Sequence, residues 1–220
     1  MTNGTEKTGY ANIQFFGKMV ASLSHEIKNV FAIIHENAGL LEDLIVLSEK
    51  GMPLDPERLK GLSKRMRDQI IRGNKIVQNM NRFAHSADEP IENIDLNQTL
   101  QLLRHLFERP VAMKGIVLET KDSENEVTIR TNPFVLENML WLCVNAAMDS
   151  MTVSKKMVLA GEEAGDSARI RVSGLDAMPE TLEANIKRGT GEMLLKELNG
   201  TLTVDSKTGA LILNLPKSIS

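Results

Sequence analysis

The feature that most constrains the fold is a long heptad pattern near the N-terminus. Apolar residues recur there in alternating steps of three and four, with Asn37 filling one slot, at Phe16, Val20, Leu23, Ile27, Val30, Ile34, Leu41 and Leu44. This spacing predicts one long helix, from about 11 to 49, whose apolar stripe packs in a helical bundle. Further apolar residues in its second half widen the stripe, which favours a four-helix core.

A second helical pattern follows after a break at residues 50–54. Asp55 predicts an N-cap and Pro56 the first turn of a helix over about 56–87. Two helices of this length form an antiparallel hairpin, and one hairpin cannot bury both stripes. We therefore expect a homodimeric four-helix bundle. The alternative is a monomeric bundle completed by later helices.

His25 lies on the exposed side of the first predicted helix. If Val20 and Ile27 occupy a positions, His25 is at f and points away from the core. A neutral imidazole is nucleophilic near neutral pH, and the Glu26 carboxylate beside it can hold one ring N–H and accept its proton. Phosphorus is the natural electrophile for such a pair. The alternative is a solvated histidine beside a surface ion pair.

The residues around His25 leave room for a partner protein. Lys28 and Asn29 follow on the same exposed face. Ser22 and Ala32 are small, so a partner could approach the helix closely. We expect these residues to border a docking surface.

Composition and charge exclude several classes. The net charge of −3 gives no reason to expect nucleic acid or an anionic membrane as a partner. No signal peptide or bilayer-length apolar run occurs, and the single cysteine, Cys143, permits no internal disulfide, so we expect a cytoplasmic protein without a membrane segment. His35, His85 and His105 have no second ligand at metal spacing, so we expect no metal site.

The second half of the chain predicts a two-layer α/β sandwich. After a polar linker at 86–90, Asp95 and Gln98 form a capping box before a helix over 96–109. Short strands then alternate with helices to the end of the chain. The fold class is therefore α+β, divided into a disordered tail (1–10), a helical hairpin (11–88) and an α/β domain (89–220).

The segment Ser24-His25-Glu26-Ile27-Lys28-Asn29 resembles the H-box of two-component sensor histidine kinases. In that family this motif lies on the first helix of a dimeric hairpin, and its histidine accepts the phosphoryl group. The family's next residue is proline, where this chain has Val30, so we expect a straighter helix here. Kinases of this type usually carry an input domain before the H-box, so we expect the signal to come from a separate protein.

Residues 95–216 resemble the catalytic ATP-binding domain of the same kinases, but with most nucleotide-binding residues replaced. Ser173 stands where the family has the adenine-binding aspartate, and Leu175 and Ala177 stand where it has glycines. Gly174 and Asp176 survive out of register, which leaves a shifted alignment open.

The phosphate side of the implied nucleotide site is also reduced. Asn145 matches an asparagine that helps to hold Mg²⁺ in the family, but Trp141 replaces the other asparagine of that helix. Gly189 and Gly191 resemble the start of the second glycine box. Only about ten residues separate Pro179 from Gly189, too few for the family's mobile lid. We therefore interpret Asn145, Gly189 and Gly191 as vestigial, and the alternative is sequence drift in a working kinase.

The resemblance implies a dimeric histidine phosphotransferase, similar to those derived from inactive kinases. His25 would exchange a phosphoryl group with receiver-domain aspartates of response regulators or of an upstream kinase, and Glu26 would orient the imidazole and accept its proton. Asn29 is also a candidate for a phosphatase role. No cofactor would be tightly bound, because the receiver supplies Mg²⁺. The alternatives are an ATP-dependent histidine kinase and a non-catalytic regulator that binds a kinase or response regulator.

Overall fold

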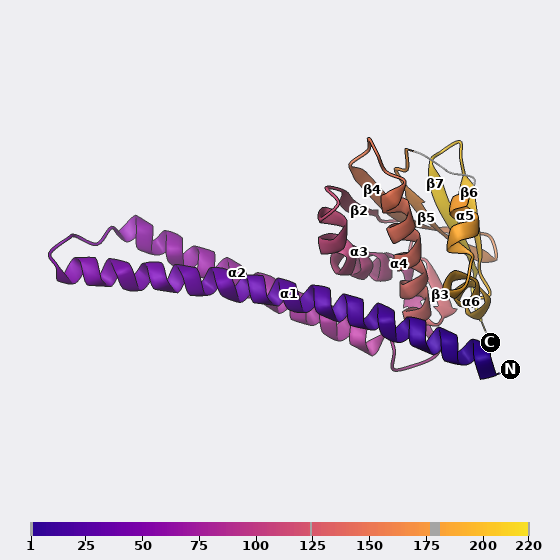
Figure 1. The fold of residues 1–220 in the computed structure, drawn as a ribbon, viewed down its shortest axis with the longest axis horizontal. Coiled ribbons are helices and arrows are strands. Elements are labelled where there is room, and N and C mark those ends of the chain that lie inside the picture. The colour runs from indigo at the N-terminus through magenta and orange to yellow at the C-terminus, as the bar shows by residue number, and fades with distance from the viewer. Residues whose placement is uncertain (1, 124, 177–180, 220) are drawn as a thin grey trace. The chain divides into compact units, whose positions relative to one another are not determined.

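The chain divides into two compact units, each described by itself below. The computed structural model describes residues 2–123, 125–176 and 181–219 (Figure 1). One unit holds Val20–Asn81, and the other holds Met1–Met19 together with Arg82–Ser220. The start of the first hairpin helix and the end of the second therefore group with the α/β part. The sequence had placed the boundary between hairpin and α/β domain near residue 88.

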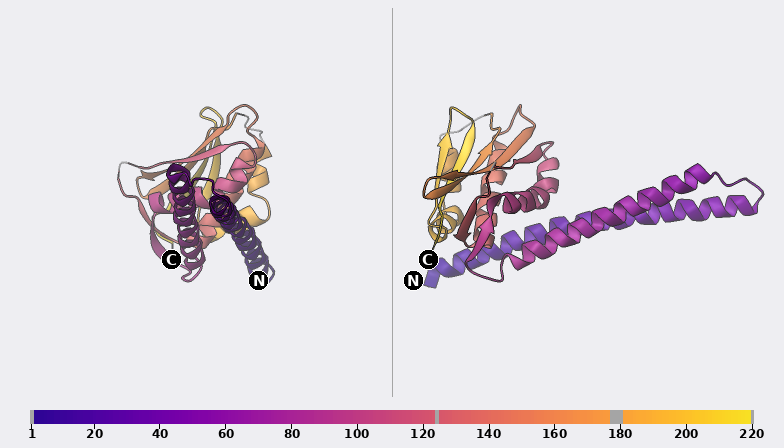
Figure 2. Two further views of the ribbon diagram at one scale, coloured as in Figure 1. Left: turned by 90° about the vertical axis from the view of Figure 1, so that its left-hand side faces the viewer. Right: turned by 180° about the vertical axis from the view of Figure 1, so that it is seen from behind.

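The first unit is an antiparallel helical hairpin, as predicted. It is made from α1 (Thr2–Glu49) and α2 (Pro56–His85), which run side by side (Figure 2). Asp55 caps α2, because its Oδ1 accepts a hydrogen bond from the Glu57 backbone N–H at 2.9 Å. The apolar seam of the unit is buried at Leu23, Val30, Leu44, Leu62 and Ile76.

The predicted seam is correct in period but shifts at its ends. Phe16 is 39% exposed, and the neighbouring Phe15 and Met19 are buried instead. An α-helix drifts by about 20° per heptad against a strict 3.5-residue repeat, so a stripe extended by counting leaves the buried face near its ends.

The N-terminal residues differ from the predicted organisation. Residues 1–10 were expected to be disordered, but α1 already begins at Thr2. Once a helix is nucleated, each further residue adds a hydrogen bond at low cost, so polar residues upstream of an apolar stripe can extend it.

The second unit is a mixed α/β layer structure, which confirms the predicted fold class. Its elements are β1 (Glu92–Asp95), α3 (Leu96–Ala112), β2 (Val117–Lys121), β3 (Thr128–Thr131), α4 (Pro133–Asp149), β4 (Lys156–Ala164), β5 (Ser167–Ser173), α5 (Thr181–Ile186), α6 (Thr190–Glu197), β6 (Thr201–Asp205) and β7 (Ala210–Pro216). The main sheet has the order β2-β4-β5-β7-β6, parallel only between β2 and β4. A second sheet pairs β1 with β3.

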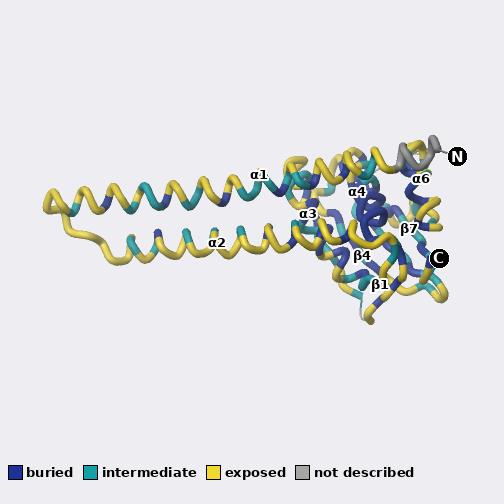
Figure 3. Tube along the Cα trace, turned by 90° about the horizontal axis from the view of Figure 1, so that it is seen from below, coloured by how far each residue is buried: buried dark blue, intermediate teal, exposed yellow. Residues whose placement is uncertain are grey.

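One face of the main sheet is covered by helices and the other is open. Side chains alternate along β5, so that Ala168, Ile170 and Val172 are buried under the helices. Buried residues concentrate on α4, the central helix of this layer (Figure 3).

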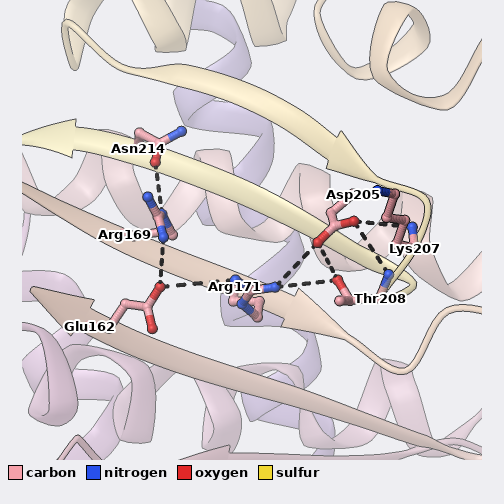
Figure 4. Close-up of polar contacts among 7 residues, drawn as sticks. All are labelled: Glu162, Arg169, Arg171, Asp205, Lys207, Thr208 and Asn214. Atoms are coloured by element: carbon pink, nitrogen blue, oxygen red, sulfur yellow. Dashed lines mark hydrogen bonds and ion pairs between the residues drawn. The ribbon is translucent and has the colours of Figure 1, made fainter. Parts of the chain in front are cut away.

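The open face carries a polar network that links four neighbouring strands (Figure 4). Arg169 on β5 donates to Asn214 on β7 at 3.1 Å and to Glu162 on β4 at 3.1 Å. Arg171 pairs with Asp205, the last residue of β6, at 3.8 Å. The side chains in these ion pairs are 29–49% exposed, so this face is open to solvent. Ion pairs that are open to solvent contribute little to stability.

Two helix caps position α3 and α4. The Asp95 carboxylate accepts from the Gln98 N–H at 3.2 Å, and Asn132 accepts from the Val135 N–H at 3.0 Å. Asp95 is also the last residue of β1. This strand was not predicted, because the capping role of Asp95 dominates the local sequence pattern. At the end of α6, Asn199 adopts a positive φ of 48°.

An aromatic cluster joins the ends of α1 and α2 to α4. The Phe83 ring is fully buried and lies 5.5 Å from Phe15, 5.5 Å from Phe16 and 5.6 Å from Phe134, measured between ring centroids. Through these edge-to-face and stacked ring contacts, the start of α1 and the end of α2 pack against α4.

Glu137 on α4 is a buried carboxyl group beside this cluster. Ser86 Oγ lies 2.7 Å from the Phe83 carbonyl oxygen and 2.8 Å from Glu137 Oε2. The hydroxyl has one proton to give and a carbonyl can only accept, so a protonated Glu137 satisfies the arrangement as the second donor. Burial raises the pKa of Glu137 from 4.5 to about 8, which agrees with a neutral group at pH 7.

Replacing Glu137 with glutamine is expected to stabilise the protein above pH 5. The folded chain keeps the Glu137 proton up to about pH 8, whereas the unfolded chain releases it near 4.5. Unfolding therefore releases a proton in this window, and the wild-type free energy of unfolding falls as the pH rises. The glutamine amide donates the same hydrogen bond without ionising, so Glu137→Gln gains roughly 2–3 kcal/mol at pH 7 and nothing at pH 4.

Urea unfolding at pH 4 and pH 7 measures this difference, with the exposed Glu89→Gln as control. A Glu137→Gln effect that is the same at both pH values would contradict a protonated Glu137.

Candidate functional site

His25 lies on the exposed surface of α1, where the heptad pattern placed it. The helix runs without a break from Thr2 to Glu49, as expected for a chain that has Val30 in place of the family's proline. Val30 is 2% exposed, and a methyl group added at Gly73 of α2 would lie 3.2 Å from its Cγ1. The two helices therefore pack closely just beyond His25.

Glu26, next to His25, is turned toward α2. Its side chain is only 13% exposed, and its Oε2 lies 3.8 Å from Nη2 of Arg72. The predicted proton acceptor is thus a partly buried carboxylate held beside a cation. Arg72 was missed from the sequence, because the register between two antiparallel helices depends on the loop that joins them.

The predicted docking residues fall into two groups. Lys28, Asn29 and Ala32 are exposed and accessible to a partner. Ser22 is partly buried, and its hydroxyl oxygen is buried without a hydrogen-bond partner among the described residues. Its role at the docking surface stays a prediction.

A second candidate site is a hollow of about 550 Å³ in the α/β unit. It lies between the C-terminal half of α4 and the α5–α6 segment, and is lined by Leu142, Asn145, Ala146, Asp149, Ser150, Leu182, Asn185, Ile186, Arg188, Thr190 and Gly191. The vestigial residues Asn145 and Gly191 are therefore brought together there. Gly189 is not part of the lining.

Ser173 and Asp176, at or near the family's base-binding positions, are not among the residues that line this hollow. Ser173 lies on β5 and donates its hydroxyl hydrogen bond to the Val158 carbonyl oxygen at 3.3 Å. Asp176 instead accepts from the backbone N–H groups of Val153 at 2.7 Å and Ser154 at 2.6 Å. These donors, with that of Thr152, lower the pKa of Asp176. The shifted alignment therefore brings no aspartate into the hollow either.

The other departures from a nucleotide site also have structural explanations. Trp141 is 8% exposed and packs against Phe107 of α3 at 5.1 Å, so it belongs to the core. Leu175 is buried, and Ala177 lies outside the described residues. A side chain at Gly191 would clash with the Ile186 carbonyl oxygen, so this glycine permits α6 to pack on α5.

These residues do not fit ATP and Mg²⁺. α5 and a short turn occupy the interval where a lid would lie. Among residues 2–123, 125–176 and 181–219, no group of three or more histidine, cysteine, aspartate or glutamate side chains could hold a metal ion. We derive no reaction step through a nucleotide in this unit.

Comparison with known proteins gives the fold. No family model and no curated protein sequence matches the chain. Among solved structures, full-length ShkA in complex with AMPPNP is similar at 16% identity and a TM-score of 0.50, covering 88% of this chain and 46% of ShkA. The chain has the fold of a histidine kinase.

Two further histidine kinases are similar at lower scores. The ThkA catalytic domain matches at 17% identity and a TM-score of 0.49, covering 60% of this chain and all of that one. AdeS from Acinetobacter baumannii matches at 14% identity and a TM-score of 0.46, covering 88% and 98%. Within its described residues, the chain has no helix with the length and apolar character of a membrane span.

Proposed function

We propose that this protein is a histidine phosphotransferase that relays phosphoryl groups between receiver-domain aspartates. The observation that carries the proposal is the exposed His25 on the unbroken helix α1, followed directly in the chain by the partly buried Glu26. Because His25 is exposed, a receiver can bring its acyl phosphate to the imidazole ring. Because Glu26 is partly buried, the carboxylate that would orient the ring has limited motion.

The transfer exchanges one bond to phosphorus for another. One ring nitrogen of His25 attacks the phosphorus, the bond to the receiver's aspartyl oxygen breaks, and the aspartate leaves as a carboxylate. The proton on the other ring nitrogen passes to Glu26, which leaves a neutral ring carrying the phosphoryl group. The reverse sequence delivers the group to a second receiver. Exposed Asn29 is positioned to orient water for receiver dephosphorylation, as the family resemblance implies.

Loss of nucleotide-binding residues supports relay rather than autokinase activity. Ser173 and Asp176 both bond to backbone groups away from the hollow. The second candidate function, an ATP-dependent kinase, is favoured only by the hollow of about 550 Å³ that still contains Asn145. In the relay, the α/β unit serves instead as a surface for docking a receiver.

The proposed active form is a homodimer. Several large apolar side chains of the hairpin unit are more than a third exposed in the single chain: Phe31, Leu40, Ile45, Val46, Leu47, Ile70, Ile71 and Val77. A second hairpin would bury them in a four-helix core.

Light scattering is expected to give twice the chain mass of 24.4 kDa, and Ile70→Glu is expected to shift the measured mass to that of the monomer. Val153→Glu, on a residue 80% exposed in the other unit, is the control, and a monomeric wild type would contradict this assignment.

The relay is tested by following one labelled phosphoryl group through two transfers. A phosphorylated receiver, freed of its kinase and of ATP, is mixed with the protein, and label on the His25 peptide is measured. A second, unphosphorylated receiver is then added. The proposal predicts loss of label from His25 and its appearance on the second receiver. Failure of every receiver in a panel to label the protein would support the regulator alternative.

A further inference from the structure

Arg72 of α2 holds a cation next to Glu26, the residue that follows His25. Its Nη2 atom lies 3.8 Å from Glu26 Oε2, which is longer than a hydrogen bond, so the pair is held by charge alone. The Arg72 side chain is 52% exposed. Its guanidinium therefore keeps donors available to an incoming anion, and a guanidinium fork matches phosphoryl oxygens in geometry and charge.

The hairpin register places Arg72 there. One heptad before it on α2, Arg65 donates from Nε to Asn37 Oδ1 at 2.8 Å, and Asn37 is 5% exposed. One residue after it, Gly73 allows α2 to approach Val30. These two contacts fix how α2 lies against α1. Arg65 is committed to Asn37, whereas the one contact that Arg72 makes through its charged group within the described part of the chain is the long one to Glu26.

Glu26 and His25 are consecutive, with Cα atoms about 3.8 Å apart. The Arg72 guanidinium therefore lies beside the residue that directly follows His25 in the chain.

We propose that Arg72 binds the phosphoryl group as it passes to and from His25, exchanging Glu26 for the phosphoryl oxygens. The inference rests on the proposed function and names a further residue for it. When Glu26 accepts the imidazole proton it becomes neutral and loses its attraction for Arg72. At the same step the phosphoryl group on His25 brings negative charge, so the guanidinium moves to the oxygens. Arg72 stays protonated throughout and forms no covalent bond.

The test uses two phosphoryl donors on the full chain. Phosphoramidate phosphorylates histidine chemically without any partner protein, and a phosphorylated receiver tests the biological transfer. For each donor, the rate of label arrival on the His25 peptide is compared among wild type, Arg72→Ala, Arg72→Lys and the control Arg67→Ala. Arg67 is an exposed arginine of the same helix. Thermal unfolding of each variant is measured in parallel.

Arg72→Ala is expected to slow transfer from the receiver roughly 10–100-fold, the effect of one charge-assisted hydrogen-bond donor. Phosphoramidate labelling is expected to slow about 10-fold, Arg72→Lys to recover part of both rates, and Arg67→Ala to match wild type. Arg72→Ala rates within twofold of wild type for both donors would overturn the inference. A third outcome is that phosphoramidate labels His25 and this labelling depends on Arg72, but no receiver labels the protein. That outcome would contradict the proposed function and support the role of Arg72. No His25 label from either donor in wild type would overturn both.

Discussion

Replacing His25 with alanine is expected to abolish phosphoryl uptake from every receiver, a loss of at least about 10³-fold. No other nucleophile in the described hairpin sits next to a partly buried carboxylate as His25 does beside Glu26. The side chain is exposed, so its removal leaves the packing of α1 intact. Transfer rates and the unfolding transition, measured on the same preparation, separate loss of chemistry from loss of fold.

His35→Ala is the matched control for this variant. His35 is another exposed histidine of α1, two to three turns further along the helix. Its variant is expected to accept label at the wild-type rate. Label that persists in His25→Ala, or that disappears in His35→Ala, would place the phospho-acceptor elsewhere.

Truncation of Phe83 to alanine is expected to cost about 3–5 kcal/mol of unfolding free energy. The ring has no exposed surface, and its centroid lies within 5.6 Å of those of Phe15 and Phe134. Its loss leaves a cavity where the ends of α1 and α2 meet α4. The only tryptophan, Trp141, is buried on α4 and reports the unfolding of this unit by fluorescence.

Tyr10→Ala provides the comparison for Phe83→Ala. Tyr10 is an aromatic residue of α1 in the same unit but is 65% exposed, so its removal is expected to change stability by less than about 0.5 kcal/mol. Equal effects of the two substitutions would show that the aromatic cluster does not stabilise the joint between the helix ends and α4.

Local patterns predicted the elements of this chain well. The heptad stripe identified the hairpin and put His25 on its surface, and the Asp55 and Asp95 caps marked two helix starts that the structure confirms. Such signals depend on periodicity and on neighbours within one turn. The ends of the stripe were less accurate, because Phe15 rather than Phe16 turns toward the core where α1 meets α4.

Contacts between distant elements could not be predicted. The Glu26–Arg72 pair requires the register between two helices, which a single sequence does not contain. The protonated Glu137 requires knowledge that Ser86 and the Phe83 carbonyl meet it in a buried space. Trp141 was recognised only as a lost asparagine, and the structure adds its reason for being there, since it fills the core against Phe107.

The central claim is that His25 receives its phosphoryl group from a receiver and not from ATP. The most direct test incubates the purified protein with labelled ATP and Mg²⁺ and, in parallel, with a phosphorylated receiver, and counts label on the His25 peptide. We expect no label from ATP and label from the receiver. Label that arrives at His25 from ATP alone, and is absent in His25→Ala, would contradict this claim and show that the hollow around Asn145 binds nucleotide.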